Sequence, residues 1–263
     1  MIGDEGHALE TKAALVCGAS RGIGRACARE FARQGARVIL VARNEKNLRA
    51  LREELGGGEH RILAADFNDP GALRGAVEQL AEEAGPIQIL LNNTGGPPSG
   101  ALLAAAPENF LAAFTSQLLC CQVLSQILVP GMKRAGYGRI INIVSTSVKQ
   151  PIRGLGVSNT VRAAVASWAK TLSVEVARFG ITVNNILPGA TRTDRLAEII
   201  RERARASGRT ERDVEAEMLR EIPAGRFADP DEIAAVAGFL AGPRAGYLNG
   251  TSIPVDGGRT LAL

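Results

Sequence analysis

Short apolar runs alternate with helix-like segments along almost the whole chain, and this alternation limits the fold more than any other feature. The first run, Ala13–Cys17, is apolar throughout, which is typical of a strand buried on both faces of a parallel sheet. Further strands are expected at residues 37–42, 61–65, 87–91, 139–144, 182–187 and 252–255. Helical patterns separate them at residues 23–34, 44–55, 70–83, 107–135, 157–178 and 229–240. The alternation predicts an α/β fold of the Rossmann type, with a doubly wound parallel sheet of about seven strands and helices on both faces.

The chain of 263 residues contains no Pro-, Gly- or Ser-rich linker, no repeat and no low-complexity segment. One domain is therefore expected at residues 13–263. The polar residues 1–12 are expected to form a flexible N-terminal tail, and they lack the apolar segment of a secretory signal. No stretch approaches the roughly 20 apolar residues of a membrane helix, so the protein is expected to be cytoplasmic.

Charge and composition argue against several classes of function. The net charge is +4 and basic residues are scattered among acids, which does not indicate a nucleic-acid or membrane surface but suits an anionic cofactor. The cysteines at positions 17, 27, 120 and 121 lie inside apolar patterns and are expected to be buried free thiols. Since the chain has only 2 histidines, no metal site is expected.

A glycine-rich turn follows the first strand and precedes the first helix. This strand–turn–helix context is the one that a dinucleotide site requires, because glycine permits the tight turn and the helix N-terminus then meets the pyrophosphate. A turn that needs glycine for its shape alone is the alternative. The residues of the turn that we expect to bind a cofactor are Gly18, Ser20, Arg21, Gly22, Ile23 and Gly24.

The end of the second strand indicates which dinucleotide is bound. An NAD site usually has an acid here that binds the ribose 2′-hydroxyl, whereas this chain has Ala42 followed by Arg43 and Asn44. Arg21 lies in the glycine turn nearby. Two guanidinium groups can bind the 2′-phosphate of NADP through charge-assisted hydrogen bonds. The sequence therefore predicts NADP(H) as the cofactor.

Two later strand ends are expected to complete the cofactor site, because ligands of open α/β sheets bind at the carboxyl ends of the strands. Asp66 and Phe67 follow the third strand, and Asp66 is either an acceptor for the adenine amino group or an ordinary turn acid. Asn93, Thr94 and Gly95 follow the fourth strand. Amide side chains at this place can tie neighbouring strands together, while Gly95 lets the cofactor lie close.

Taken in order, these motifs resemble the short-chain dehydrogenase/reductase family over essentially the whole chain after the tail. The segments that carry the resemblance are Gly18-x-x-x-Gly22-Ile23-Gly24, Asn92-Asn93-x-Gly95, Ser145, Pro188-Gly189 and Gly250-x-x-x-x-Val255-Asp256-Gly257-Gly258. Within the family, the chain looks most like bacterial 3-oxoacyl-acyl-carrier-protein reductases. The resemblance implies that four residues approach the nicotinamide, namely Pro188, Gly189, Thr191 and Thr193. It also implies a substrate lid at about residues 190–222, where the pattern alone is equally typical of a solvated helix pair.

The resemblance implies a catalytic serine, tyrosine and lysine, with an asparagine on an earlier helix. Ser145 matches the serine, but the chain has Ser158 at the tyrosine position and Arg162 at the lysine position. Gln117 falls at about the asparagine position. The register holds because residues 163–184 continue the helix and strand of the family, and residues 146–156 contain no tyrosine. These four residues are the catalytic candidates, and Arg162 is also expected at the nicotinamide ribose.

The replacements change the proton chemistry. A phenol has a pKa of about 10, whereas a serine hydroxyl is a much weaker acid and arginine does not readily lose its proton. One hypothesis is an atypical NADP(H)-dependent oxidoreductase in which Ser145 and Ser158 bind the oxygen of a carbonyl or hydroxyl substrate, Arg162 supports the oxyanion and water delivers the proton. The second is an NADP(H)-binding sensor or oligomer partner without turnover. The third is non-redox chemistry, such as dehydration or isomerisation, in the same cleft.

The helix expected at residues 157–178 is apolar on much of its surface. Val165, Trp168 and Leu172 fall on one stripe and alanines occupy much of the rest, so the helix is expected to be buried throughout. The resemblance implies that it pairs across a homodimer, often within a homotetramer. The other expected partner is a small-molecule substrate, with no nucleic acid and no membrane.

Overall fold

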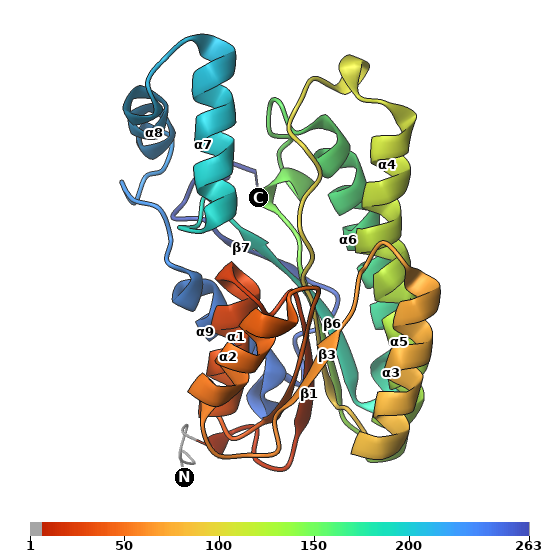
Figure 1. Cartoon of the computed structure of the whole chain (residues 1–263). Coiled ribbons are helices and arrows are strands. Elements are labelled where there is room, and N and C mark those ends of the chain that lie inside the picture. The colour runs from red at the N-terminus through yellow and green to blue at the C-terminus, as the bar shows by residue number, and fades with distance from the viewer. Residues whose placement is uncertain (1–6, 263) are drawn as a thin grey trace.

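The computed structural model describes residues 7–262, which form a seven-stranded sheet in which all neighbouring strands are parallel (Figure 1). The strand order is β3-β2-β1-β4-β5-β6-β7. The strands are β1 (Ala13–Cys17), β2 (Arg37–Ala42), β3 (Arg61–Ala64), β4 (Ile89–Asn92), β5 (Gly138–Ile143), β6 (Ile181–Pro188) and β7 (Ser252–Val255). The fold class predicted from the alternation of apolar runs is confirmed.

Helices cover both faces of the sheet. The helices on one face are α1 (Gly22–Arg33), α2 (Glu45–Leu55) and α9 (Pro230–Ala241). Those on the other face are α3 (Pro70–Ala84), α5 (Cys120–Ala135) and α6 (Gly156–Val176). The remaining helices are α4 (Pro107–Phe114), α7 (Asp194–Ser207) and α8 (Glu211–Arg220). Figure 1 shows α7 and α8 standing together beyond the end of the sheet, apart from α4 and α6.

The predicted flexible tail is wrong for residues 7–12. Leu9 is fully buried in the same core cluster as Phe31, and its backbone N–H donates to the Gln34 carbonyl at 2.9 Å. Burying one leucine side chain stabilises the fold by about 1.5–3 kcal/mol, which helps to offset the cost of ordering this segment. A single apolar residue in a polar stretch gives no periodic pattern, so the sequence did not reveal the anchor. Residues 1–6 of the predicted tail lie outside the described residues.

The helix predicted at residues 107–135 is continuous but not uniform. A π-helical turn, Thr115–Leu119, joins α4 to α5. By length and composition alone this helical run could cross a membrane, which corrects the expectation that no segment is long and apolar enough. In the fold, however, Leu124, Leu128 and Met132 pack into the core against the sheet, as in the core helix of a globular domain.

A row of buried amide side chains crosses the sheet near its carboxyl edge. Asn92 Nδ2 donates to Asn142 Oδ1 at 2.8 Å, and Asn142 Nδ2 donates to Asn185 Oδ1 at 2.9 Å. Asn185 Nδ2 donates in turn to Ser252 Oγ at 3.0 Å. These bonds tie β4, β5, β6 and β7 together, as the sequence predicts for the amides after the fourth strand. They fix the edge of the sheet on which the site is built.

Candidate functional site

A cavity of about 690 Å³ lies at the carboxyl edge of the sheet. It spans the ends of β1 and β4, between which the strand order reverses, and this is where ligands bind in open α/β sheets. The predicted cofactor residues that line it are Gly18, Ser20, Arg21, Gly22, Ile23, Arg43, Asn44, Phe67, Asn93, Thr94, Gly95, Arg162, Pro188, Gly189, Thr191 and Thr193. Two other predicted cofactor residues, Gly24 and Asp66, do not line the cavity.

The glycine turn is packed too tightly for larger residues. Gly18 has φ of +63°, and a Cβ there would lie 2.5 Å from the Asn93 carbonyl oxygen. A Cβ on Gly24 would clash with the Gly18 carbonyl oxygen, so Gly24 serves the packing of helix against turn. Gly22 begins α1 with φ of +55°, opposite Thr193. These are the contacts that a pyrophosphate-binding turn requires.

The N-terminus of α1 opens into this cavity, which Gly22 and Ile23 line. The first turn of α1 contains no acid, and the N-cap residue Arg21 makes no capping bond through its side chain. The free N–H groups and the positive end of the helix dipole therefore favour a phosphate.

Two arginines lie where the 2′-phosphate is expected. Arg43 is exposed directly after β2 and forms no ion pair with any acid of residues 7–262. Arg21 Nη1 lies 3.3 Å from Asp194 Oδ2 at the start of α7, and the two side chains are 62% and 70% exposed. Such exposed pairs contribute about 0–1 kcal/mol, so Arg21 can exchange Asp194 for a phosphate at small cost.

Asp66 stabilises a turn in the structure, while its role as an acceptor for adenine stays a prediction. Its Oδ1 accepts hydrogen bonds from the backbone N–H and the Nδ2 of Asn68, at 3.0 and 2.9 Å. The neighbouring Phe67 is buried and lines the cavity in its place.

The serines predicted to be catalytic, Ser145 and Ser158, line the same cavity. Ser145 Oγ accepts a hydrogen bond from the Ser147 N–H at 3.1 Å, which leaves its own O–H available to donate. Ser158 lies in the first turn of α6, half-buried, and its hydroxyl makes no hydrogen bond within the described part of the chain. The fold thus brings two hydroxyl donors to one cavity.

Arg162 lies one turn after Ser158 on α6 and is 9% exposed. Its Nη1 donates to the Ile143 carbonyl at 2.8 Å and its Nη2 to the Thr94 carbonyl at 3.3 Å. Burial lowers the pKa of Arg162 to about 10, so the guanidinium remains protonated at neutral pH. None of the ion pairs between described residues includes Arg162. A buried positive charge without a counter-ion therefore borders the cavity.

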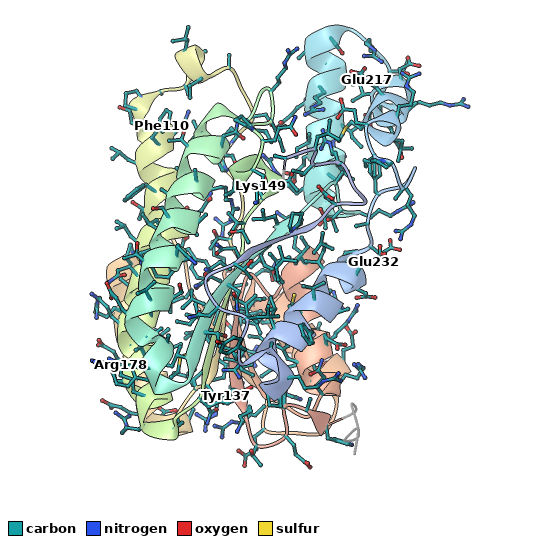
Figure 2. All side chains as sticks on the ribbon, turned by 180° about the vertical axis from the view of Figure 1, so that it is seen from behind. Phe110, Tyr137, Lys149, Arg178, Glu217 and Glu232 are labelled. Atoms are coloured by element: carbon teal, nitrogen blue, oxygen red, sulfur yellow. The ribbon has the colours of Figure 1, made fainter. Side chains whose placement is uncertain are left out.

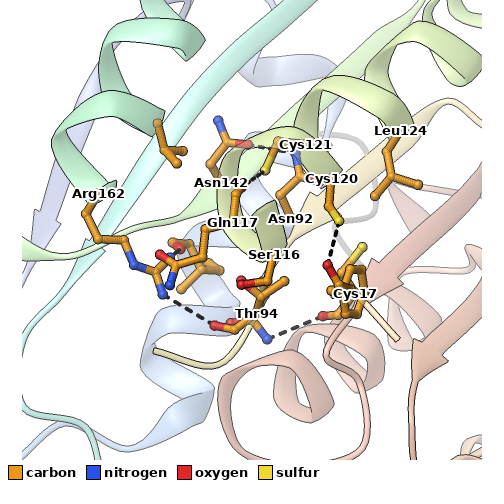
Figure 3. A pocket seen from close by; sticks show the side chains of 14 residues that line it. Cys17, Asn92, Thr94, Ser116, Gln117, Cys120, Cys121, Leu124, Asn142 and Arg162 are labelled. Carbon is orange, nitrogen blue, oxygen red and sulfur yellow. Dashed lines mark hydrogen bonds between the residues drawn. The ribbon is translucent and has the colours of Figure 1, made fainter. Parts of the chain in front are cut away.

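A second, small cavity of about 10 Å³ lies beside Arg162 and Gln117 (Figure 3). Gln117 is 2% exposed, and its Nε2 donates to the Gly95 carbonyl at 3.3 Å. Its Oε1 has no hydrogen-bond partner among the described residues. Because Gln117 does not line the larger cavity, it fits a positioning role better than the catalytic role that the sequence predicts.

All four cysteines are buried and free, as predicted. Burial raises the pKa of the Cys120 and Cys121 thiols to about 12, so they stay protonated and behave as small apolar side chains. Across residues 7–262, no cluster of three or more His, Cys, Asp or Glu side chains could hold a metal ion.

The segment after β6 carries the predicted nicotinamide residues to the cavity and then begins α7. Thr193 Oγ1 accepts from the Leu196 N–H at 3.4 Å and so caps the helix. α7 and α8 share a hydrophobic cluster of their own, which includes Ile200 and Met218. The predicted pair of helices is confirmed, and it packs as a separate unit beside the cavity.

Arg195 lines the cavity from the first turn of α7, although it was not among the predicted site residues. Arg195 Nη2 donates to the Pro97 carbonyl at 2.8 Å, and Ser99 Oγ donates to Glu202 Oε2 at 2.7 Å. These two bonds join α7 to the loop that follows β4. The signal in the sequence was a cation in the first turn of a helix, where the dipole disfavours positive charge.

Comparisons with known proteins agree with this geometry. A family model described as enoyl-(acyl carrier protein) reductase matches residues 18–260. The chain is 34% identical over 250 residues to the 3-oxoacyl-[acyl-carrier-protein] reductase FabG of Vibrio cholerae serotype O1, and the match covers 95% of this chain and 98% of that protein.

Two solved structures are similar to almost the whole chain. The L-sorbose reductase from Gluconobacter frateurii, complexed with NADPH and L-sorbose, has a TM-score of 0.89 at 32% identity and covers 99% of this chain and 100% of its own. The actinorhodin polyketide ketoreductase with NADPH has a TM-score of 0.90 at 31% identity, and the match covers 95% of this chain and 97% of that chain.

Proposed function

The chain belongs to the short-chain dehydrogenase/reductase family of NAD(P)-dependent oxidoreductases. We propose that it is an NADP(H)-dependent reductase of carbonyl substrates in which serine and arginine replace the residues that usually transfer the proton. The observation that carries the proposal is the cavity in which the glycine turn, the open N-terminus of α1 and two serine hydroxyls meet. Its named relatives, a 3-oxoacyl-[acyl-carrier-protein] reductase, an L-sorbose reductase and a polyketide ketoreductase, support a carbonyl compound, including a 3-oxoacyl thioester, as substrate.

NADP(H) is the cofactor that the residues of this cavity fit. The glycine turn and the N-terminus of α1 would hold the diphosphate, since the turn packs closely on Asn93 and the first turn of α1 contains no acid. Arg43 and Arg21 would hold the 2′-phosphate, and both similar structures were solved with NADPH. Thr191 and Thr193 would lie at the nicotinamide. When bound, NADPH supplies the hydride.

The residues of the chain bind and polarise the substrate oxygen. Ser145 and Ser158 donate hydrogen bonds to it from their hydroxyls. The positive charge of Arg162 and the N-terminus of α6, whose first turn has no acid, stabilise the negative charge that develops on that oxygen. Water at the mouth of the cavity delivers the proton, because the serine hydroxyl is too weak an acid and Arg162 keeps its proton at neutral pH.

Steady-state loss of NADPH with a panel of ketones and 3-oxoacyl thioesters tests the proposal. Ser145→Ala is expected to lower kcat/KM by about 100-fold, because it removes a donor aimed at the oxyanion, while NADPH affinity stays unchanged. Ser207→Ala is the matched control, because Ser207 is exposed at the C-terminal end of α7 and does not line the cavity, and it should leave kcat/KM and NADPH affinity unchanged.

The second candidate is an NADP(H)-binding sensor or oligomer partner without turnover. Ser158 and Arg162 favour it, because neither side chain is a ready proton donor at neutral pH. Tight NADPH binding with no NADPH loss over the whole panel would support the sensor and contradict the reductase. For either function we propose a cytoplasmic homodimer or homotetramer, in which exposed apolar side chains of α4 and α6 are covered.

A further inference from the structure

Two consecutive backbone carbonyls beside the larger cavity are held by side chains from two different helical segments. The Thr94 carbonyl accepts from Arg162 Nη2 on α6, and the Gly95 carbonyl accepts from Gln117 Nε2 in the π-helical turn, each at 3.3 Å. Arg162 Nη1 also holds the Ile143 carbonyl at the end of β5, at 2.8 Å. Figure 3 shows Arg162 reaching Thr94 beside Gln117.

The segment Thr94–Gly95 forms a wall between the two cavities. Thr94 lines both of them, and Gly95 lines the larger one. Along the sheet, β4 lies between β1, which ends at the glycine turn, and β5, which is followed by Ser145. The wall therefore supports the part of a ligand that lies beyond the diphosphate, toward Ser145 and away from Arg43 at the end of β2.

Both donors are built deep into the fold. Gln117 is the buried residue of the π-helical turn, and its own carbonyl accepts a hydrogen bond from Cys121 Sγ at 2.7 Å. A π-helical turn inside an α-helix often marks a functional position. Arg162 is a buried cation that satisfies its donors with backbone carbonyls, since no acid of the described chain pairs with it. Loss of either donor removes one of the hydrogen bonds that hold this partly exposed segment in place.

We propose that Gln117 and Arg162 together form a brace, a pair of positioning residues that sets the Thr94–Gly95 wall where it supports the nicotinamide half of NADP(H). The brace gives Gln117 a role that needs no contact with substrate or cofactor. It rests on the proposed function in one respect, because it requires NADP(H) in the larger cavity. It does not depend on turnover, so it holds for a reductase and for a sensor.

Binding of NADPH and of 2′,5′-ADP, which has the adenosine phosphates but no nicotinamide, separates the two halves of the site. Gln117→Met keeps the length of the side chain and removes the donor. NADPH affinity is expected to fall up to about tenfold, as for loss of one hydrogen bond, while 2′,5′-ADP affinity stays unchanged. The enhancement of nicotinamide fluorescence on binding should fall as well. An unchanged 2′,5′-ADP affinity also shows that the glycine turn is still folded.

Gln122→Met is the matched control, because Gln122 lies on the same helical run and binds Trp168 Nε1 at 2.8 Å, away from the cavity. It should leave both affinities unchanged. Gln117→Asn, whose shorter amide does not reach Gly95, should repeat the selective loss if Gln117→Met does not fold. Arg162→Lys should lose less NADPH affinity than Arg162→Met, since it keeps a charged donor.

Equal losses for both ligands in the Gln117 variants, or no loss for either, would overturn the brace. A wild-type protein that binds neither NADPH nor 2′,5′-ADP would overturn the proposed function instead.

Discussion

Ser158 and Arg162 occupy two successive turns of α6, at the positions where the family resemblance places a tyrosine and a lysine. Ser158 presents a hydroxyl to the cavity, and Arg162 is buried with its guanidinium on the carbonyls of Thr94 and Ile143. The cavity therefore keeps a donor and a positive charge at these positions, but it lacks a group that releases a proton near neutral pH. The glycines and arginines of the cofactor half show no corresponding change.

The double variant Ser158→Tyr/Arg162→Lys is expected to raise NADPH-dependent turnover by at least about tenfold, because a positioned general acid contributes about 10²–10⁴-fold. The larger side chain has room to enter a cavity of about 690 Å³. Steady-state kinetics with the wild type's best ketone gives the answer, with NADPH affinity measured in parallel. Ser207→Tyr, at the exposed C-terminal end of α7, controls for the added phenol. A folded double variant that binds NADPH normally and turns over no faster would contradict this assignment.

Among the helices and strands, the sequence predicts the features that depend on local pattern. Buried runs such as Ala13–Cys17 reveal the strands, and glycine spacing reveals the turn at Gly18. What it does not reveal depends on contacts between distant segments. Leu9 is anchored by Gln34, and Gln117 turns toward Gly95 because of a π-helical turn that leaves no mark in the apolar pattern. Arg195 reaches the cavity only because α7 packs against the loop after β4.

The start of β2 should respond to pH through His60. His60 Nδ1 accepts a hydrogen bond from the Val38 N–H at 3.0 Å, and burial lowers the pKa of His60 below its ordinary value of 6.5. The unfolded chain therefore binds this proton more readily than the folded chain. The free energy of unfolding should fall as the pH drops from about 7 to about 5, through the ordinary pKa toward the folded one. Urea denaturation at a series of pH values measures how the free energy of unfolding depends on pH. This dependence should be weaker in His60→Asn and unchanged in His7→Asn, which replaces an exposed histidine. The same pH dependence of the free energy of unfolding in the wild type and in His60→Asn would contradict the role of His60.

The two halves of the site come from different parts of the sheet. The ends of β1 and β2 supply the glycine turn and Arg43, while the ends of β5 and β6 supply Ser145 and the segment that begins α7. The sequence predicts that the helix at residues 157–178 is buried throughout. This prediction is wrong, because Val174 on α6 is 73% exposed at the outer surface. On neighbouring α4, Leu111 is 68% exposed. Figure 2 shows the α6 side of the molecule, with α4 beside it.

Assembly should bury this apolar surface. Light scattering after size exclusion is expected to give a dimer or tetramer for the wild type, because exposed apolar side chains on adjacent helices favour a symmetric contact. Leu111→Asp/Val174→Asp should shift the protein toward the monomer. Ala216→Asp, which adds a negative charge at an exposed position of α8, should leave the assembly intact. A wild-type monomer at micromolar concentration would refute the expected assembly.

We expect the cofactor half of the site to be whole and to select NADP(H). Calorimetric titration of the wild-type protein with NADPH and with NADH measures this selectivity. NADPH is expected to bind at least about tenfold more tightly than NADH, because charge-assisted bonds from Arg43 and Arg21 hold its 2′-phosphate. Arg43→Ala should reduce this difference in affinity. Failure to bind NADPH, or equal affinity for the two nucleotides, would contradict this expectation.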